Sequence, residues 1–236
     1  MNRAARLAPL LAAAALALSG CSLDTILAPA AASTSPAAAA PAINADVAAA
    51  ALAQLDTIAT KGRAPKTGYE RSQFGPAWKD IDRNGCDQRN DILTRDLTGK
   101  TFKAGTNECV VLSGDLADPY TGTTIHFERG GASEVDIDHL VPLGDAWQKG
   151  AQGWDQAKRE QLANDPANLA ATSASANRSK GDSDMATWLP PARNNWCHYA
   201  AGIVAVKANY GLWMTPAEHD RARQILTDCM TTPRQE

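Results

Sequence analysis

The chain has 236 residues, of which 44% are hydrophobic and 21% charged, and its formal net charge is −3. These values are ordinary for a globular protein and exclude a wholly disordered chain, a collagen-like fibre and a protein with many membrane spans. Without the first 20 residues, which hold two arginines and no acid, the net charge is −5. Charge therefore does not indicate a strongly basic nucleic-acid binder, and any nucleic-acid contact would be a local patch.

The first 21 residues have the pattern of an export signal. Arg3 and Arg6 precede an apolar run over residues 7–18, which is too short to span a bilayer. Residues 18–21, Leu-Ser-Gly-Cys, resemble a bacterial lipobox, which predicts that residues 1–20 are a lipoprotein signal peptide and that Cys21 is lipidated. A lipid there would hold the exported protein on the outer face of the cell membrane. The alternative is an ordinary secretory signal that contains a cysteine.

Residues 21–45 are expected to form the lipid-anchored cysteine and a linker, because they are mostly Ala, Ser, Thr and Pro. The folded domain is expected to span residues 46–236, which is long enough for one core. Its four cysteines allow three pairings, of which pairing between sequence neighbours is favoured. That pairing predicts the disulfides Cys86–Cys109 and Cys197–Cys229, with free buried thiols as the alternative.

The folded part is expected to mix helices with short strands. Residues 45–60 show helical spacing, whereas residues 62–90 are rich in Gly, Pro and Arg and are expected to be mainly loop. Strand candidates begin at Ile92, Leu93 and Leu97 and are clearest over 110–112 and 123–127, and further strands are predicted over 135–141 and 168–172. Helices are predicted over 144–163 with a break at Gly150 and Gly153, from the cap Ser173 through Asn177 and Lys180, over 194–210 with a stop at Gly211, and from Thr215 onward.

Three polar segments combine into a candidate site. A strand–strand–helix unit would bring Asp138 and His139, on the first strand, opposite Asn177 on the helix. Carboxylate and amide oxygens are hard ligands, so the sequence predicts one divalent metal, Mg²⁺ ahead of Mn²⁺, with coordination positions left for a phosphate. A histidine beside that metal is suited to act as a general base.

In combination, these segments resemble the HNH nucleases with a ββα-metal motif. The nearest likeness is the exported bacterial branch related to the HNH domain of GmrSD restriction nucleases. The spacing of nine from Asn168 to Asn177 is also similar to that of the HNH domain in RNA-guided CRISPR nucleases. The matching motifs are Asp-His-Leu-Val-Pro-Leu, a Trp-containing insert, Asn-Asp-Pro-Ala-Asn-Leu, Asn-Arg-Ser-Lys-Gly-Asp and Trp-Leu-Pro-Pro, at 138–143, 147–154, 164–169, 177–182 and 188–191.

The resemblance implies an α+β fold in which a ββα-metal core is surrounded by helices and short strands and stapled by disulfides. It also implies roles for five residues. His139 would be the general base, Asp138 and Asn177 the metal ligands, and Asn168 a support for the base. Lys180, one helical turn from Asn177, would meet a phosphate or the leaving group.

Other charged residues are weaker candidates. Asp136 is read equally well as a group near the metal or as an exposed strand residue. The arginines with a potential phosphate contact are Arg178, Arg159, Arg129 and Arg89.

The function expected from the resemblance is metal-dependent hydrolysis of phosphodiester bonds by an endonuclease of low sequence specificity. DNA is the expected substrate, with RNA as a second choice, and no protein partner is implied. The alternative is a catalytically silent lipoprotein that binds nucleic acid or the cell envelope. It would require a degenerate site, whereas Asp138, His139, Asn168 and Asn177 are all present.

Overall fold

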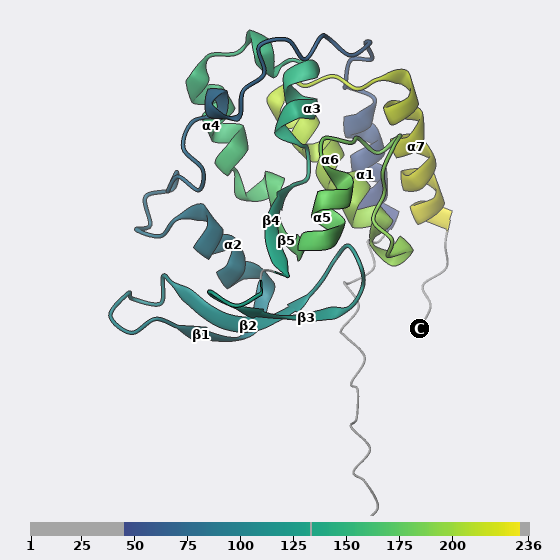
Figure 1. Cartoon of the computed structure of the whole chain (residues 1–236). Coiled ribbons are helices and arrows are strands. Elements are labelled where there is room, and N and C mark those ends of the chain that lie inside the picture. Colours follow the sequence, from purple (N-terminus) through teal and green to yellow (C-terminus); the bar gives the residue numbers. More distant parts are fainter. Residues whose placement is uncertain (1–44, 133, 232–236) are drawn as a thin grey trace, which may run out of the picture. The chain divides into compact units, whose positions relative to one another are not determined.

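The computed structural model describes residues 45–132 and 134–231, which mix helices with short antiparallel strands (Figure 1). The predicted signal peptide, Cys21 and almost all of the predicted linker lie outside these residues. No helix in the described ranges combines the length and the apolar character that crossing a membrane requires.

The α-helices are α1 (Ala45–Leu55), α2 (Gln88–Asp96), α3 (Leu143–Gln148), α4 (Gln156–Asn164), α5 (Ala174–Lys180), α6 (Trp196–Tyr210) and α7 (Pro216–Thr231). The 3₁₀ turns are η1 (Arg71–Phe74), η2 (Ala151–Gly153), η3 (Pro166–Asn168) and η4 (Arg193–Asn195). The strands are β1 (Leu97–Phe102), β2 (Val111–Ala117), β3 (Thr124–Glu128), β4 (Val135–His139) and β5 (Leu169–Ser173). In the described ranges, four strands follow α2 in succession, and β5 stands alone between helices.

The strands form two sheets. An antiparallel three-stranded sheet has the order β1-β2-β3, and β4 pairs with β5 in a separate antiparallel ribbon. Helix α2 packs against β1, β2 and β5, so it joins the two sheets, and α5 packs against both β4 and β5 (Figure 1). Strands β4 and β5 with helix α5 therefore form the strand–strand–helix unit that the sequence predicted.

Two hydrophobic clusters meet at β4. One is built largely from the helices α1, α3, α6 and α7, and the other from α2 and both sheets. Ile137 belongs to the sheet cluster, whereas Val141 and Leu143, just beyond the strand, belong to the helical one. Asp138 and His139 lie where the chain passes from one cluster to the other, so apolar packing on both sides fixes their position.

Local signals predicted most element boundaries. Ser173 Oγ accepts a hydrogen bond from the backbone N–H of Ala176 at the start of α5, and Gly211, with φ +70°, ends α6. Thr215 Oγ1 accepts from the N–H of Glu218 at the start of α7. Both expected disulfides, Cys86–Cys109 and Cys197–Cys229, are confirmed.

Several boundaries differ from the prediction; the strand expected over 110–112 is β2, which continues to Ala117, and the strand expected over 135–141 ends at His139. Ile92 and Leu93 are in helix α2 and not in a strand, because the Asp87 carboxylate accepts from the N–H of Asn90 at 2.8 Å and caps the helix. The first helix ends at Leu55, short of the expected residue 60.

A buried ion network fastens the helical side of the fold. Lys149 Nζ lies within 2.7 Å of carboxylate oxygens of Asp145, Asp184 and Glu218, and all four side chains are at most 2% exposed. Lys207 Nζ also binds Asp145, at 2.9 Å, and Glu218, at 2.5 Å. The network thereby connects α3, α6, α7 and the loop that follows α5.

We expect Lys149→Met to lower the free energy of unfolding by about 3–5 kcal/mol, because it removes the buried cation that three carboxylates share and leaves an excess of buried negative charge, with Lys207 and Arg63 as the remaining partners. Arg223→Met, which breaks the exposed pair with Asp56, is the control and should cost less than about 1 kcal/mol. Urea unfolding of both variants measures the difference. Equal losses would show that the network contributes no more than a surface pair.

Candidate active site

Asp138 presents one carboxylate oxygen to the interior and leaves the other unused. Its Oδ2 accepts hydrogen bonds from the Tyr120 hydroxyl at 2.5 Å and from Lys180 Nζ at 2.7 Å. Within the described part of the chain, no hydrogen bond uses Oδ1. Asp138 is 6% exposed and lines a cavity of about 380 Å³. The two donors therefore orient the carboxylate, and its free oxygen remains available to a ligand in that cavity.

His139 has a defined tautomer. Its Nε2 lies 2.8 Å from the backbone carbonyl oxygen of Ala163 in α4. Because a carbonyl oxygen only accepts, Nε2 carries the proton, and Nδ1 of the neutral ring is left with a lone pair. The ring of Trp78 stacks on His139, with centroids 6.2 Å apart and an interplanar angle of 14°. Burial, reinforced by the positive charges of Arg71 and Lys180, lowers the pKa of His139 to about 3.

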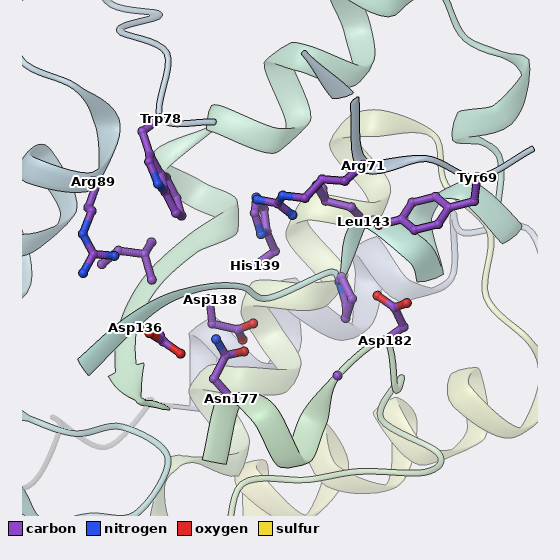
Figure 2. Close-up of a pocket in the computed structure, with 13 residues that line it drawn as sticks. Tyr69, Arg71, Trp78, Arg89, Asp136, Asp138, His139, Leu143, Asn177 and Asp182 are labelled. Carbon is purple, nitrogen blue, oxygen red and sulfur yellow. The ribbon is translucent and has the colours of Figure 1, made fainter. Parts of the chain in front are cut away.

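Asn177 brings an amide to the same cavity from α5. Figure 2 shows its side chain next to the Asp138 carboxylate, with the His139 ring on the other side of that carboxylate. The side chain of Asn177 forms no hydrogen bond within the described residues. Residues 39 positions apart in sequence are therefore brought together by the packing of α5 against β4.

Asn168 is fully buried and supports the site from behind. Its Oδ1 accepts from the N–H of Val141 at 2.8 Å, and its Nδ2 donates to the carbonyl of Leu162 at 3.2 Å. Leu162 precedes Ala163, whose carbonyl holds His139. The amide thus ties the end of α4 to the segment after β4, and its role as a support for a catalytic base stays a prediction.

Lys180 does not reach the cavity, which corrects its expected contact with a phosphate. It is 1% exposed, and its Nζ donates to Asp138 Oδ2 at 2.7 Å and to the His139 carbonyl at 2.6 Å. Burial lowers the pKa of Lys180, whereas the Asp138 charge opposes that shift. Lys180 therefore positions β4 and has no access to a substrate.

The predicted arginines divide into two groups. Arg89 lines the cavity. Arg178 is exposed, and one of its nitrogens lies 3.9 Å from a carboxylate oxygen of Asp136, a residue that also lines the cavity. Arg159 is only 8% exposed and binds the Gln73 carbonyl and other backbone oxygens, so it is structural. Arg129 donates to the Val111 carbonyl and to the side chain of Asn90 and does not line the cavity.

Four site residues were not predicted from the sequence. Tyr69, Arg71 and Trp78 come from the 62–90 segment and line the cavity on the side opposite β4 (Figure 2). Tyr120, in the turn between β2 and β3, is 1% exposed and binds Asp138. No local pattern signals these contacts. The aromatic residues in a Gly- and Pro-rich segment were the available hint, because such side chains in a loop need a surface to pack on.

Comparison with known proteins assigns the family. Residues 87–224 match the model of the C-terminal domain of GmrSD restriction endonucleases. The chain belongs to this family. The matched range contains the whole strand–strand–helix unit, but Tyr69, Arg71 and Trp78 precede it. No solved structure matches this chain.

The chain is also similar to an "Uncharacterized secreted protein" of the fungus Arthroderma benhamiae. The two are 36% identical over 177 residues, which cover 74% of this chain and 82% of the relative. This relative is fungal, so the expected placement in a specifically bacterial branch is not supported. A secreted relative and two disulfides agree with export.

The buried neutral His139 predicts a pH dependence of stability. In the unfolded chain a histidine binds a proton below about pH 6.5, whereas in the folded chain the pKa is about 3. Stability should therefore be full above pH 6.5 and fall as the pH drops toward 3, by up to about 1.4 kcal/mol per pH unit.

Urea unfolding in EDTA from pH 7.5 to 4 measures this slope. His139→Gln should flatten it, and His126→Gln, on the exposed strand β3, is the control. An unchanged slope in His139→Gln would contradict a buried neutral ring.

Proposed function

We propose that the protein is an HNH-type, metal-dependent endonuclease that hydrolyses phosphodiester bonds of nucleic acid, with DNA as the first candidate substrate. One observation carries the proposal: Asp138, His139 and Asn177 meet at one cavity on a strand–strand–helix unit. Membership in a family named for restriction endonucleases supports it.

The donor set suits a hard divalent cation such as Mg²⁺. Asp138 Oδ1 and the Asn177 amide oxygen are the oxygens that would hold it. Among the described residues, no three His, Cys, Asp or Glu side chains are arranged around a common metal position. A site with few protein ligands is typical of Mg²⁺, which keeps several waters and shares a substrate phosphate. When bound, the metal supplies a Lewis acid that withdraws charge from the phosphate and the leaving oxygen.

His139 is the group suited to take the proton of the attacking water. Its Nδ1 is unprotonated, because Nε2–H is committed to the Ala163 carbonyl. Trp78 covers one face of the ring and fixes its plane. Asn168 holds the end of α4, and with it the carbonyl that selects the tautomer. These contacts orient the base before any substrate arrives, which is how a fixed geometry lowers a barrier.

Arg71 and Arg89 are the candidates for binding the phosphate backbone, because both line the cavity. The protein as a whole is acidic, so no long-range field attracts nucleic acid. Binding through two local cations predicts weak, salt-sensitive affinity with little sequence preference.

The same proposal places the protein outside the cytoplasm. Two disulfides and a secreted relative support export. Anchoring to the outer face of the membrane by a lipid on Cys21 stays a prediction from the Leu-Ser-Gly-Cys motif.

We expect His139→Ala to lower the rate of plasmid nicking in Mg²⁺ or Mn²⁺ by about 10²–10⁴-fold, which is the usual contribution of a general base. The control is His126→Ala, because His126 is exposed on β3 and pairs with Asp115, outside the cavity. Nicking by His139→Ala at the wild-type rate would refute the mechanism. Absence of cleavage of DNA and RNA by folded wild-type protein with any metal would favour the silent binding lipoprotein.

We expect Asn177→Ala to weaken metal binding and leave the base intact. The rate at low Mg²⁺ should fall, and raising Mg²⁺ should restore much of it. Titration of the nicking rate against Mg²⁺ measures the shift, with wild type and His139→Ala run in parallel. A rate loss in Asn177→Ala that no Mg²⁺ concentration repairs would remove Asn177 from the ligand set.

A further inference from the structure

The segment that precedes α2 has a spacing of oxygen-bearing residues that the proposed nuclease chemistry does not use. Residues 80–91 read Asp-Ile-Asp-Arg-Asn-Gly-Cys-Asp-Gln-Arg-Asn-Asp. Calcium-binding loops of the EF-hand type take ligands from positions 1, 3, 5, 7, 9 and 12 of twelve and place Gly at position 6. Here those positions hold Asp80, Asp82, Asn84, Cys86 (through its carbonyl), Gln88 and Asp91, with Gly85 sixth. Two features depart from the EF-hand pattern: position 12 is Asp in place of Glu, and no helix leads into the loop, since residues 75–80 are turn and coil.

The backbone turns sharply within this segment, including at the glycine of position 6. Gly85 has φ +91° and Arg83 has φ +60°, so the chain turns sharply at positions 4 and 6. Asp80 accepts from the N–H groups of Asn84 at 3.2 Å and Gly85 at 2.9 Å, which curls the loop around the first carboxylate. Helix α2 begins inside the loop, at Gln88.

The acidic side chains converge on one amide. Asn84 Nδ2 donates to Asp82 Oδ2 at 3.3 Å and to Asp91 Oδ1 at 3.1 Å. Within the described residues, no salt bridge neutralises Asp80, Asp82 or Asp91. The three carboxylates thus lie near one another and have only neutral hydrogen-bond donors as partners. A bound cation would reduce their mutual repulsion.

A separate observation points to a missing ligand. Gln88 is 0% exposed, and neither its Oε1 nor its Nε2 has a hydrogen-bond partner in the described structure. The second oxygen of Asp91, Oδ2, is also buried without a partner, although its Oδ1 binds within the loop. Buried polar atoms without partners cost free energy, so natural proteins rarely keep them unless a water or an ion completes them. These atoms occupy positions 9 and 12, where a calcium loop places its water-mediated and bidentate ligands.

We infer that residues 80–91 bind one Ca²⁺ ion, at a site separate from Asp138 and Asn177. The carboxylates are not closed into a cage in this structure, so the ion would draw them together, and the affinity should be that of extracellular modules, with a Kd of about 10⁻⁴–10⁻³ M. The disulfide Cys86–Cys109 ties the loop to the segment before β2. The loop therefore has less conformational freedom to lose when the ion binds.

The site would also brace one wall of the catalytic cavity. Arg89, at position 10 of the loop, lines the cavity, and the N–H of Gln88 donates to the Trp78 carbonyl at 3.3 Å. This link to catalysis rests on the proposed function, whereas Ca²⁺ binding itself does not.

The test is thermal unfolding of the full chain after EGTA treatment, with Ca²⁺ or Mg²⁺ added. Ca²⁺ at about 100 times its Kd should raise the Tm by roughly 5–10 °C, and Mg²⁺ at the same concentration should raise it far less. Isothermal titration with Ca²⁺ should show one site. The absence of a Ca²⁺-dependent shift, or an equal shift with Mg²⁺, would overturn the inference.

Two variants test whether Asp91 and Asp82 bind the ion or only stabilise the fold. Asp91→Asn should be at least as stable as wild type in EGTA, because it removes a crowded negative charge, and should lose the Ca²⁺ shift. Asp82→Asn, at an exposed position that tolerates change, should lose the shift as well. Asp115→Asn, on the exposed part of β2, is the matched control and should keep it. A full shift in both Asp91→Asn and Asp82→Asn would refute the site.

The variant Asp138→Asn distinguishes the calcium site in the loop from the proposed catalytic metal site. It removes a ligand of the proposed catalytic metal and should retain the whole Ca²⁺ shift. If Asp138→Asn abolishes the shift, Ca²⁺ binds at the catalytic cavity and the loop site is wrong. If the protein cleaves no nucleic acid but shows the loop-dependent shift, the nuclease proposal fails and the calcium site stands.

Discussion

Asp138 is a carboxylate placed between two hydrophobic clusters, and its burial constrains much of the surrounding structure. A charge in such a position is stable only when nearby donors replace the water it has lost. Lys180 and Tyr120 provide those donors, and they come from α5 and from the turn between β2 and β3. The same ammonium group also binds the His139 carbonyl. Satisfying one buried oxygen therefore joins the ribbon, the helix after it and the three-stranded sheet.

The remaining site residues depend on that junction. With β4 held on one side by α5 and on the other by the two clusters, the His139 ring reaches the end of α4, where Ala163 sets its tautomer. The buried network around Lys149 and Lys207 then fixes α3 and the loop after α5, the two segments that flank β4 and α5 along the chain. The side chains of the proposed active site are thus carried by secondary structure that buried charged groups stabilise.

Features with a local physical cause could be predicted from the sequence. The stop at Gly211, the cap at Thr215 and the start of α5 at Ser173 each depend on neighbouring residues, and so does the strand pattern that marked Asp138 and His139. Ile92 and Leu93 were misassigned because two adjacent apolar residues suit a strand or a helix, and only the cap at Asp87 decides between them. Lys180 was correctly placed on α5 but given the wrong partner, because helix periodicity gives the face of a side chain and not its depth.

Contacts between distant segments left no such signal. Tyr120 precedes its partner Asp138 by 18 positions, and Lys149 lies 69 positions from Glu218. The cavity wall formed by Tyr69, Arg71 and Trp78 likewise comes from a segment whose composition indicated only loop. Such contacts follow from how the whole chain packs. A single sequence therefore predicts the candidate site residues that lie in motifs better than it predicts the distant residues that contact them.

The disulfide between Cys86 and Cys109 has a consequence for where the protein can work. It fastens the loop that carries Arg89 into the cavity. In a reducing compartment that fastening is absent, and one wall of the cavity loses its covalent tether. For the proposed nuclease, a chain still inside the cell that makes it would then have a less rigid site while it is near the genome, and oxidation after export would add the missing bond. The bond would make redox state a safeguard for the producing cell.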